Sequence, residues 1–103
     1  MTENSAQPND LIHQALRLKI MAALSAARED GPLEFNRLKA LTGATDGNLS
    51  THLSTLENAG YLGIDKDFVG KKPRTRVAIS KAGLAAFREH MRYLREIIEA
   101  SET

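Results

Sequence analysis

Six basic side chains lie between positions 66 and 81 of this chain, and a single acidic residue interrupts them. Four of the six fall within positions 71–76, a density that favours contact with an anionic polymer. Ammonium and guanidinium groups donate readily to phosphate oxygens, although lysine is also common in solvated loops. The basic residues are Lys66, Lys71, Lys72, Arg74, Arg76 and Lys81, and the acidic one is Asp67.

A second candidate surface lies in residues 44–61, which read ATDGNLSTHLSTLENAGY. Its leucines, Leu49, Leu53 and Leu56, recur at helical spacing and predict a helix with one buried side. Thr45 is suited to cap the start of this helix, and Gly60 to follow its end. The opposite side is short, polar and uncharged, which suits a helix that lies in a groove. Its residues are Gly47, Asn48, Thr51, Thr55 and Asn58.

The sequence contains no cysteine, so a thiolate metal site is excluded and a transition-metal site would have to depend on histidine. His52 falls on the flank of the predicted groove helix, where it either donates to a base or phosphate or packs at the edge of the helix. His13 and His90 lie on different predicted helices, so a histidine site would need ligands assembled across a dimer. The sequence therefore predicts no metal and no cofactor.

Several elements must position these two surfaces. Residues 1–9 predict a mobile tail, and residues 10–29 a helix that Asp10 caps. Asp30, Gly31 and Pro32 stop that helix, and a very short strand at Leu33 and Glu34 follows. A brief helix over residues 35–41 should bury Phe35, Leu38 and Leu41. A three-residue turn then leads into the groove helix, and this spacing is typical of a helix-turn-helix.

After Gly60 the pattern alternates with a period of two, which predicts a strand over residues 62–68. Residues 76–79 predict a second strand, paired with the first as an antiparallel hairpin. The connecting loop, residues 69–75, is longer than a two-residue turn. Arg74 and Arg76 alternate with Thr75 and Val77, so both arginines are expected to point outward.

The last predicted helix covers residues 81–100, with Ser80 as its cap. Its apolar positions step by three and four, the spacing of a helix–helix seam. Part of the seam must pack within the domain, but its length favours a partner chain, and the first helix has an equally wide apolar surface. The predicted dimer interface comprises Ile12, Leu16, Ile20, Phe87, Met91, Leu94 and Ile98.

Bulk properties limit the class of protein. The 103 residues suffice for one domain, and the net charge of +1, from 14 basic and 13 acidic residues, makes the basic stretch a local feature. No apolar run approaches the roughly 18 residues of a membrane span, and no signal peptide is evident, which predicts a cytoplasmic protein without membrane contact. No phosphate-binding loop or nucleophile motif is present, so an enzyme is not predicted.

The order of elements resembles that of a winged helix, an α+β fold made mostly of helices. The sequence resembles the small single-domain winged-helix transcriptional regulators related to the MarR and ArsR families, and two stretches carry the match. They are FNRLKALTGATDGNLSTHLSTLENAGYLGID and GKKPRTRVAISKAGLAAF. The matching positions are Phe35, Leu38, Thr42, Gly43, Asn48, Leu49, Ser50, His52, Leu53, Leu56, Glu57, Gly60 and Tyr61, then Ser80 and Gly83.

This resemblance implies a homodimeric regulator bound to double-stranded DNA, with long terminal helices forming the dimer interface. Residues 45–58 would be the reading helix in the major groove, and residues 69–76 the wing on the minor groove or phosphates. Such relatives often bind small molecules, although no residue set here identifies an effector. The implied DNA contacts are Asn48, Ser50, Thr51, His52 and Thr55 on the helix, and Lys71, Lys72, Arg74 and Arg76 on the wing.

One position departs from the family pattern. Many relatives carry arginine or lysine where this chain has Thr51, and a threonine offers one hydroxyl and a methyl in place of a bidentate guanine reader. The neutral helix and near-zero net charge also support an alternative function, a winged-helix module that binds protein and has weak or no affinity for DNA.

Overall fold

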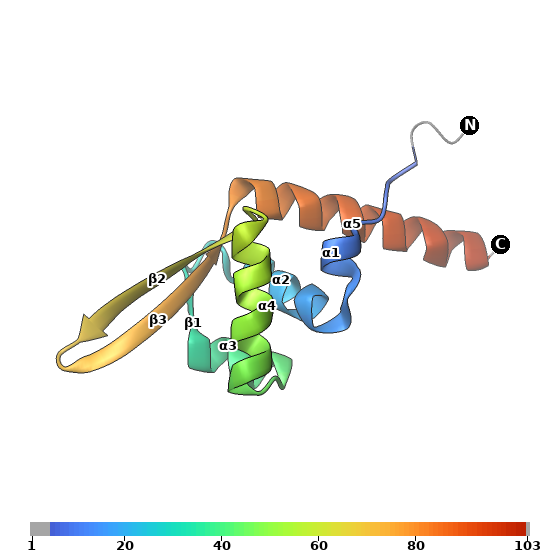
Figure 1. The fold of residues 1–103 in the computed structure, drawn as a ribbon. Helices are drawn as coiled ribbons and strands as arrows, with labels where there is room; N and C mark the ends of the chain where they lie inside the picture. The colour runs from blue at the N-terminus through green and yellow to red at the C-terminus, as the bar shows by residue number, and fades with distance from the viewer. Residues whose placement is uncertain (1–4, 103) are drawn as a thin grey trace.

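The computed structural model describes residues 5–102 and confirms the expected α+β architecture, in which helices predominate (Figure 1). A small antiparallel sheet lies beside the helices. The elements in chain order are α1 (Asp10–His13), α2 (Ala15–Ala27), β1 (Leu33–Glu34), α3 (Phe35–Thr42), α4 (Asp46–Asn58), β2 (Leu62–Val69), β3 (Lys72–Ile79) and α5 (Lys81–Ser101).

The core forms where the helices meet the base of the hairpin. The leucine stripe of α4 faces this core, and Val77 of β3 closes it from the sheet side. All three α4 leucines are at most 2% exposed, as the helical spacing predicts. The buried apolar residues are Ile12, Ile20, Met21, Leu24, Leu38, Leu49, Leu53, Leu56, Leu62, Val77 and Phe87.

The sheet has the strand order β1-β3-β2, with both pairings antiparallel. The short β1 covers β3 only at Arg76 and Val77, so the rest of that edge is open. Residues that pair directly across two strands share a face, because side chains alternate along each strand. Leu62 and Ile79 therefore lie on the core side, whereas Asp65 and Arg76 lie on the outer side.

The hairpin differs from its predicted form. The strands continue to Val69 and Lys72, so only Gly70 and Lys71 form the turn, and the prediction of a longer loop was wrong. Gly70 has φ 64°, and a glycine at the first central position is the preference of type II′ turns. Pro73 is accommodated because β1 does not reach it, so that stretch of β3 is an edge.

The first predicted helix is two helices. Gln14 has ψ 132°, which is extended backbone, and its side chain caps α2 by accepting from the Arg17 N–H at 2.9 Å. The cap of α1 is Asn9, whose Oδ1 accepts from the Ile12 N–H at 3.0 Å; Asp10 is the first residue of that helix. The break lets α1 turn toward α5, against which it packs.

Ala6 and Asn9, both within the predicted mobile tail, bond to side chains of α5. The Ala6 N–H donates to the Glu96 carboxylate at 3.1 Å, and the Ala6 side chain is only 4% exposed. Asn9 donates through its backbone to His90 and through its amide to the Tyr61 hydroxyl. Residues 1–4, the rest of that predicted tail, lie outside the described residues.

Two of the expected burial assignments require correction. Leu41 of α3 is 49% exposed, because it faces a shallow groove between α2 and α3 instead of the core. Ile12, Ile20 and Phe87 were predicted at a dimer interface, but the protomer itself buries them, and Ile12 and Ile20 have no exposed surface. These three residues therefore belong to the protomer's own core.

The far end of α5 extends beyond the core, opposite the hairpin (Figure 1). The described chain consequently measures 57 × 24 × 23 Å. Ile97 and Ile98 are about half exposed on this projecting end, whereas Leu16, Met91 and Leu94 are half-buried. Within residues 5–102, no helix is both long and apolar enough to cross a membrane.

Candidate nucleic-acid interface

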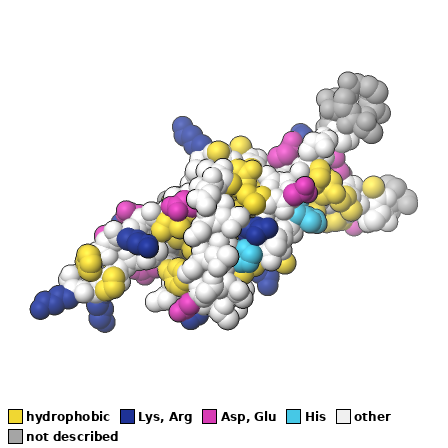
Figure 2. Space-filling view, viewed as in Figure 1, with side chains coloured by type: hydrophobic (Ala, Val, Ile, Leu, Met, Phe, Trp, Pro, Cys, Tyr) yellow, Lys and Arg dark blue, Asp and Glu magenta, His cyan; other side chains and the backbone are white. Residues whose placement is uncertain are grey.

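The reading helix α4 presents a neutral polar face. Thr45 caps it by accepting from the Asn48 N–H at 3.2 Å, as its position predicts. Asn48, Ser50 and Thr51 are exposed, and Thr55 is half-buried with its hydroxyl donating to the Thr51 carbonyl. Figure 2 shows the front of α4 as an almost uninterrupted white surface between coloured patches. This face offers hydrogen-bonding groups without formal charge.

His52 lies on one flank of that face, half-buried against α2. Its Nδ1 accepts a hydrogen bond from Nη1 of Arg17, with 3.0 Å between the two nitrogens. The sequence predicted for His52 either donation to a base or phosphate or packing at the edge of the helix, and neither prediction included this contact with Arg17. Sequence reasoning missed it because Arg17 and His52 are 35 positions apart and belong to elements whose packing no local pattern specifies.

The whole hairpin of β2 and β3, called the wing from here on, carries three exposed lysines: Lys66, Lys71 and Lys72. None of them forms an ion pair within residues 5–102. Lys71 occupies the turn itself, and Lys72 closes it. Phe68, 70% exposed, lies at the same tip, where Figure 2 shows yellow and dark-blue side chains together. The wing is therefore a basic projection with an apolar tip.

The two wing arginines are held by carboxylates of the neighbouring strand. Arg74 donates twice to Asp67, at 2.9 and 2.7 Å, and Arg76 lies 3.4 Å from Asp65 and 3.3 Å from Asp67. The hydrogen bonds from Arg74 lower the pKa of Asp67 and, in turn, raise the pKa of Arg74. Both arginines were predicted to point outward toward DNA; they do lie on the outer face, but their charges are compensated there.

A cleft of 270 Å³ separates α4 from the inner face of the hairpin. Lys66 and Thr75, a directly paired couple in the sheet, line it from the wing, and Ser50 and Ser54 line it from α4. Lys66 was counted in the basic stretch but was not predicted as a DNA contact. Its alternation with Asp65 and Asp67 along β2 was the available signal, because it places Lys66 on the opposite face from those acids.

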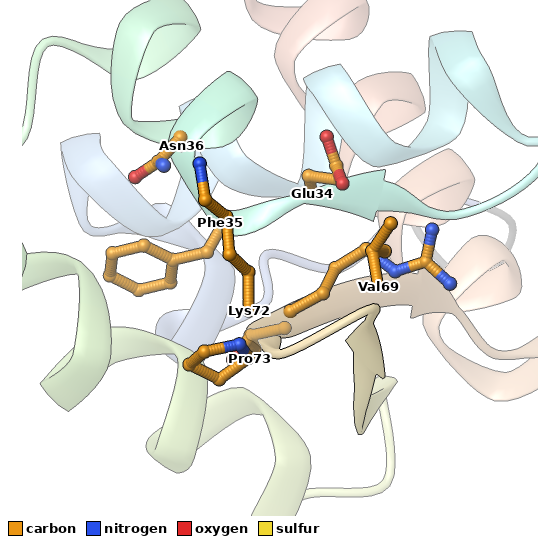
Figure 3. A pocket seen from close by; sticks show the side chains of 8 residues that line it. Glu34, Phe35, Asn36, Val69, Lys72 and Pro73 are labelled. Carbon is orange, nitrogen blue, oxygen red and sulfur yellow. The ribbon is translucent and has the colours of Figure 1, made fainter.

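A second pocket, of 290 Å³, lies at the open edge of β3. Figure 3 shows Phe35 and Asn36, from the start of α3, beside Lys72 and Pro73 of the hairpin. Glu34 also lines this pocket, and its charge adds to that of Asp67 in raising the pKa of Arg74. Acidic groups accompany the basic ones at this edge, in contrast to the side of the hairpin that faces α4.

His13 and His90 form a pair remote from α4. His90 is fully buried, and its Nδ1 accepts from the Asn9 N–H at 3.0 Å, so its Nε2 carries the proton toward His13 Nδ1, 3.3 Å away. Burial, and then the nearby His13, lower the pKa of His90, against a smaller opposing effect of Asp10. Residues 5–102 contain no cluster of three or more side chains suited to a metal ion.

Comparison with known proteins agrees with this geometry. An uncharacterised protein of Methanocaldococcus jannaschii is 33% identical over 92 residues, which cover 89% of this chain and 94% of that relative. A transcriptional regulator homologue from Pyrococcus horikoshii OT3 has the same fold, with a TM-score of 0.81 and 26% identity over 90% of this chain and 89% of the other.

Two more distant solved structures share the fold. The putative transcriptional regulator YtfH from Salmonella typhimurium has a TM-score of 0.67 and 19% identity, over 90% of this chain and 86% of its own. NadR in complex with 4-hydroxyphenylacetate also has a TM-score of 0.67, with 22% identity over 89% and 65% of the two chains.

The predicted resemblance to winged-helix transcriptional regulators is thus confirmed, and the Pyrococcus and Salmonella structures are described as a transcriptional regulator homologue and a putative transcriptional regulator. Residues 16–98 match the sequence model of the family described as "Winged helix DNA-binding domain". With its helix-turn-helix of α3 and α4 and its projecting hairpin, the chain belongs to the winged helix DNA-binding domain family.

Proposed function

We propose that the protein is a homodimeric transcriptional regulator that binds double-stranded DNA, with α4 in the major groove and the wing on the adjacent minor groove or phosphates. The observation that carries this proposal is the neutral, exposed face of α4 together with three lysines of the hairpin that have no carboxylate partner within residues 5–102. One of them, Lys66, lines the cleft beside α4. A face without charge can approach base edges closely, while nearby cations attract the phosphates on either side of the groove.

Base recognition by α4 would be modest and directed to A·T pairs. The Asn48 amide can both donate to and accept from one adenine edge, and the Thr51 methyl can contact the methyl group of thymine. The Thr55 hydroxyl already donates to its own helix, so toward DNA it can act only as an acceptor. Each good contact of this type discriminates by about 1–3 kcal/mol.

Affinity would come mainly from the wing. Lys66, Lys71 and Lys72 form no ion pair within the described part of the chain and can pair with phosphates directly, whereas Arg74 and Arg76 must first leave their carboxylates. Each phosphate contact releases counterions and contributes about −0.9 to the slope of log K against log salt. Three lysines in each of two protomers would therefore give a slope of about −5.

Dimerisation would use the projecting end of α5 with half-buried positions nearer the core. Ile97 and Ile98 expose apolar surface there, and Leu16, Met91 and Leu94 are the predicted interface residues that the protomer leaves partly uncovered. A two-fold pair of winged helices would contact two half-sites about one helical turn apart, in an approximate inverted repeat.

Selection of bound sequences from a random DNA pool, followed by fluorescence anisotropy on the selected site, tests the proposal. We expect an inverted repeat, a protein–DNA stoichiometry of two protomers per site, and loss of binding when Lys66, Lys71 and Lys72 are all changed to glutamine. Changing the same three residues to arginine keeps the charges and should preserve binding. No enriched sequence and no binding at low salt would contradict the proposed function.

A protein-binding module is the second candidate, and the ion pairs of the wing favour it. Asp65 and Asp67 pair with two of the hairpin's five basic side chains, Arg74 and Arg76, which weakens the attraction of the hairpin to DNA. This candidate predicts no DNA binding by the purified dimer, even at low salt, and a stable complex with a protein partner.

A further inference from the structure

We propose that Arg17 of α2 and His52 of α4 together form a binding site for one phosphate of the DNA backbone, with Arg17 also fixing the tautomer of His52. The inference rests on the proposed DNA-binding function and adds a contact from outside the reading helix and the wing. It supplies positive charge on the flank of a helix that contains no lysine or arginine of its own.

Arg17 is held in place from two directions. Its Nε–H donates to the Leu11 carbonyl, near the end of α1, and its Nη1 donates to His52. A guanidinium has five N–H donors, so three are left uncommitted by these contacts. Within residues 5–102 no carboxylate pairs with Arg17, which distinguishes it from Arg74 and Arg76. Its charge is therefore anchored but uncompensated.

The contact with Arg17 decides which nitrogen of His52 carries the proton. A guanidinium can only donate, so His52 Nδ1 must be the acceptor, and the proton of the neutral imidazole is on Nε2. Nε2–H then remains as a donor at the edge of the α4 face, next to the exposed Thr51. The bonded pair of Arg17 and His52 thus combines one positive charge with several uncommitted N–H donors, the groups from which a phosphate oxygen accepts.

The position of the pair fits the geometry of a groove. Around the axis of α4, His52 lies on the flank nearest α2, and Ser50 lies on the other flank, where the cleft with Lys66 begins. A helix in the major groove has a phosphate backbone on each side of it. Figure 2 shows dark-blue and cyan surface together beside the white face of α4, on the side away from the hairpin. Lys66 and Arg17 would then contact the two phosphate backbones of DNA on opposite sides of the groove.

A purely structural role, in which Arg17 only fastens α1 and α2 to α4, predicts different results. It predicts that removing the charge changes stability but not the salt dependence of DNA binding. The phosphate site predicts that DNA affinity becomes less steeply dependent on salt, because fewer counterions are released when one phosphate contact is removed.

The test measures DNA affinity as a function of salt for Arg17→Gln, Arg17→Lys and Arg28→Gln. Arg28, the C-cap of the same helix, donates through its side chain to the Ser25 carbonyl and pairs with no carboxylate among residues 5–102, so its variant is a matched charge control. We expect Arg17→Gln to lower the steepness of log K against log salt by about 0.9 per bound protomer. Arg17→Lys should keep the slope but weaken binding, and Arg28→Gln should change neither.

A second measurement does not depend on the stability of the arginine variants. The ¹⁵N shifts of the His52 ring should report the Nε2–H tautomer in the unaltered protein. His52→Gln keeps a donor where Nε2 was and should bind more tightly than His52→Ala. If the unaltered protein binds DNA and Arg17→Gln leaves the slope unchanged, or if His52 is protonated on Nδ1, the phosphate site is refuted and the proposed function stands. If the unaltered protein binds no DNA, the proposed function fails with it.

Discussion

Replacement of Gly83 by alanine should destabilise the fold, although alanine is the better helix former. A Cβ at this position of α5 would overlap the Tyr61 carbonyl oxygen and lie 2.7 Å from its carbon and 3.0 Å from its Cα. Carbon atoms in ordinary contact are about 3.5–4.0 Å apart, so α5 must retreat by about 1 Å from the start of β2. The contact is with backbone, which cannot rotate away as a side chain could.

The retreat would break a compact set of hydrogen bonds. The Ser80 N–H donates to the Tyr61 carbonyl at 3.0 Å, the Ser80 hydroxyl donates to the Gly60 carbonyl at 2.6 Å, and the Gly83 N–H donates to that hydroxyl at 2.9 Å. Overpacking destabilises by about 1–3 kcal/mol, and each lost hydrogen bond destabilises by about 0.5–1.5 kcal/mol. The higher helix propensity of alanine relative to glycine offsets at most about 1 kcal/mol of this loss. We expect a net loss of about 2–4 kcal/mol in the free energy of unfolding.

Urea denaturation followed by circular dichroism measures this difference. Both proteins are compared at the same concentration, because the stability of a dimer depends on protein concentration. Gly47→Ala in α4 is the matched control, since nothing lies within 4 Å of its Cβ position and its φ is ordinary. That variant should be more stable by up to about 1 kcal/mol. Equal or greater stability of Gly83→Ala would refute the close approach of α5 to Tyr61.

Three further predictions follow from the ion pairs, the buried histidine and α5. Asp67→Asn should release Arg74 and tighten DNA binding at low salt with a steeper salt dependence, measured by anisotropy; unchanged affinity would mean that Arg74 does not reach DNA. The pKa of His90 lies below its ordinary 6.5, so on acidification the unfolded chain binds this proton before the folded chain does. The free energy of unfolding should therefore fall as the pH drops below about 6.5, by up to about 1.4 kcal/mol per pH unit, until the pKa of the folded state is reached. Urea titrations at several pH values check this, and His90→Gln should flatten the curve. Ile98→Glu, at a side chain 55% exposed in the protomer, should raise the dimer dissociation constant on the order of a hundredfold in light-scattering measurements; an unchanged constant would exclude this end of α5 from the interface.

Local chemistry explains which elements the sequence predicted well. The caps Thr45 and Ser80 bond to N–H groups three residues away, and Gly43 and Gly60 adopt the positive φ that their positions require. The leucine stripe of α4 likewise depends only on helical spacing. Such signals act within a few residues, so they identify elements and the winged-helix order without knowledge of the packing.

Breaks and extensions of elements were predicted less well, because their local signals are weak or mixed. Gln14 has no sequence feature that marks it as extended, and its role as a cap depends on how α1 turns toward α5. Gly70 and Pro73 suggested a long loop, but the pairing of Val69 with Lys72 shows that the register of the strands decides where the turn begins. A proline is tolerated there only because the edge is open.

The sequence by itself determined the fold, the neutral reading helix and the presence of a basic hairpin. Tertiary structure decided which charges remain available: it pairs Arg74 with Asp67 across the hairpin, leaves Lys66 beside α4, and brings Arg17 to His52. The physical reason is that a charge is cancelled or preserved by its neighbours in space, and strand register and helix packing choose those neighbours. The uncharged helix α4 therefore has basic side chains on both flanks, one from the adjacent β2 and one from α2, far earlier in the chain.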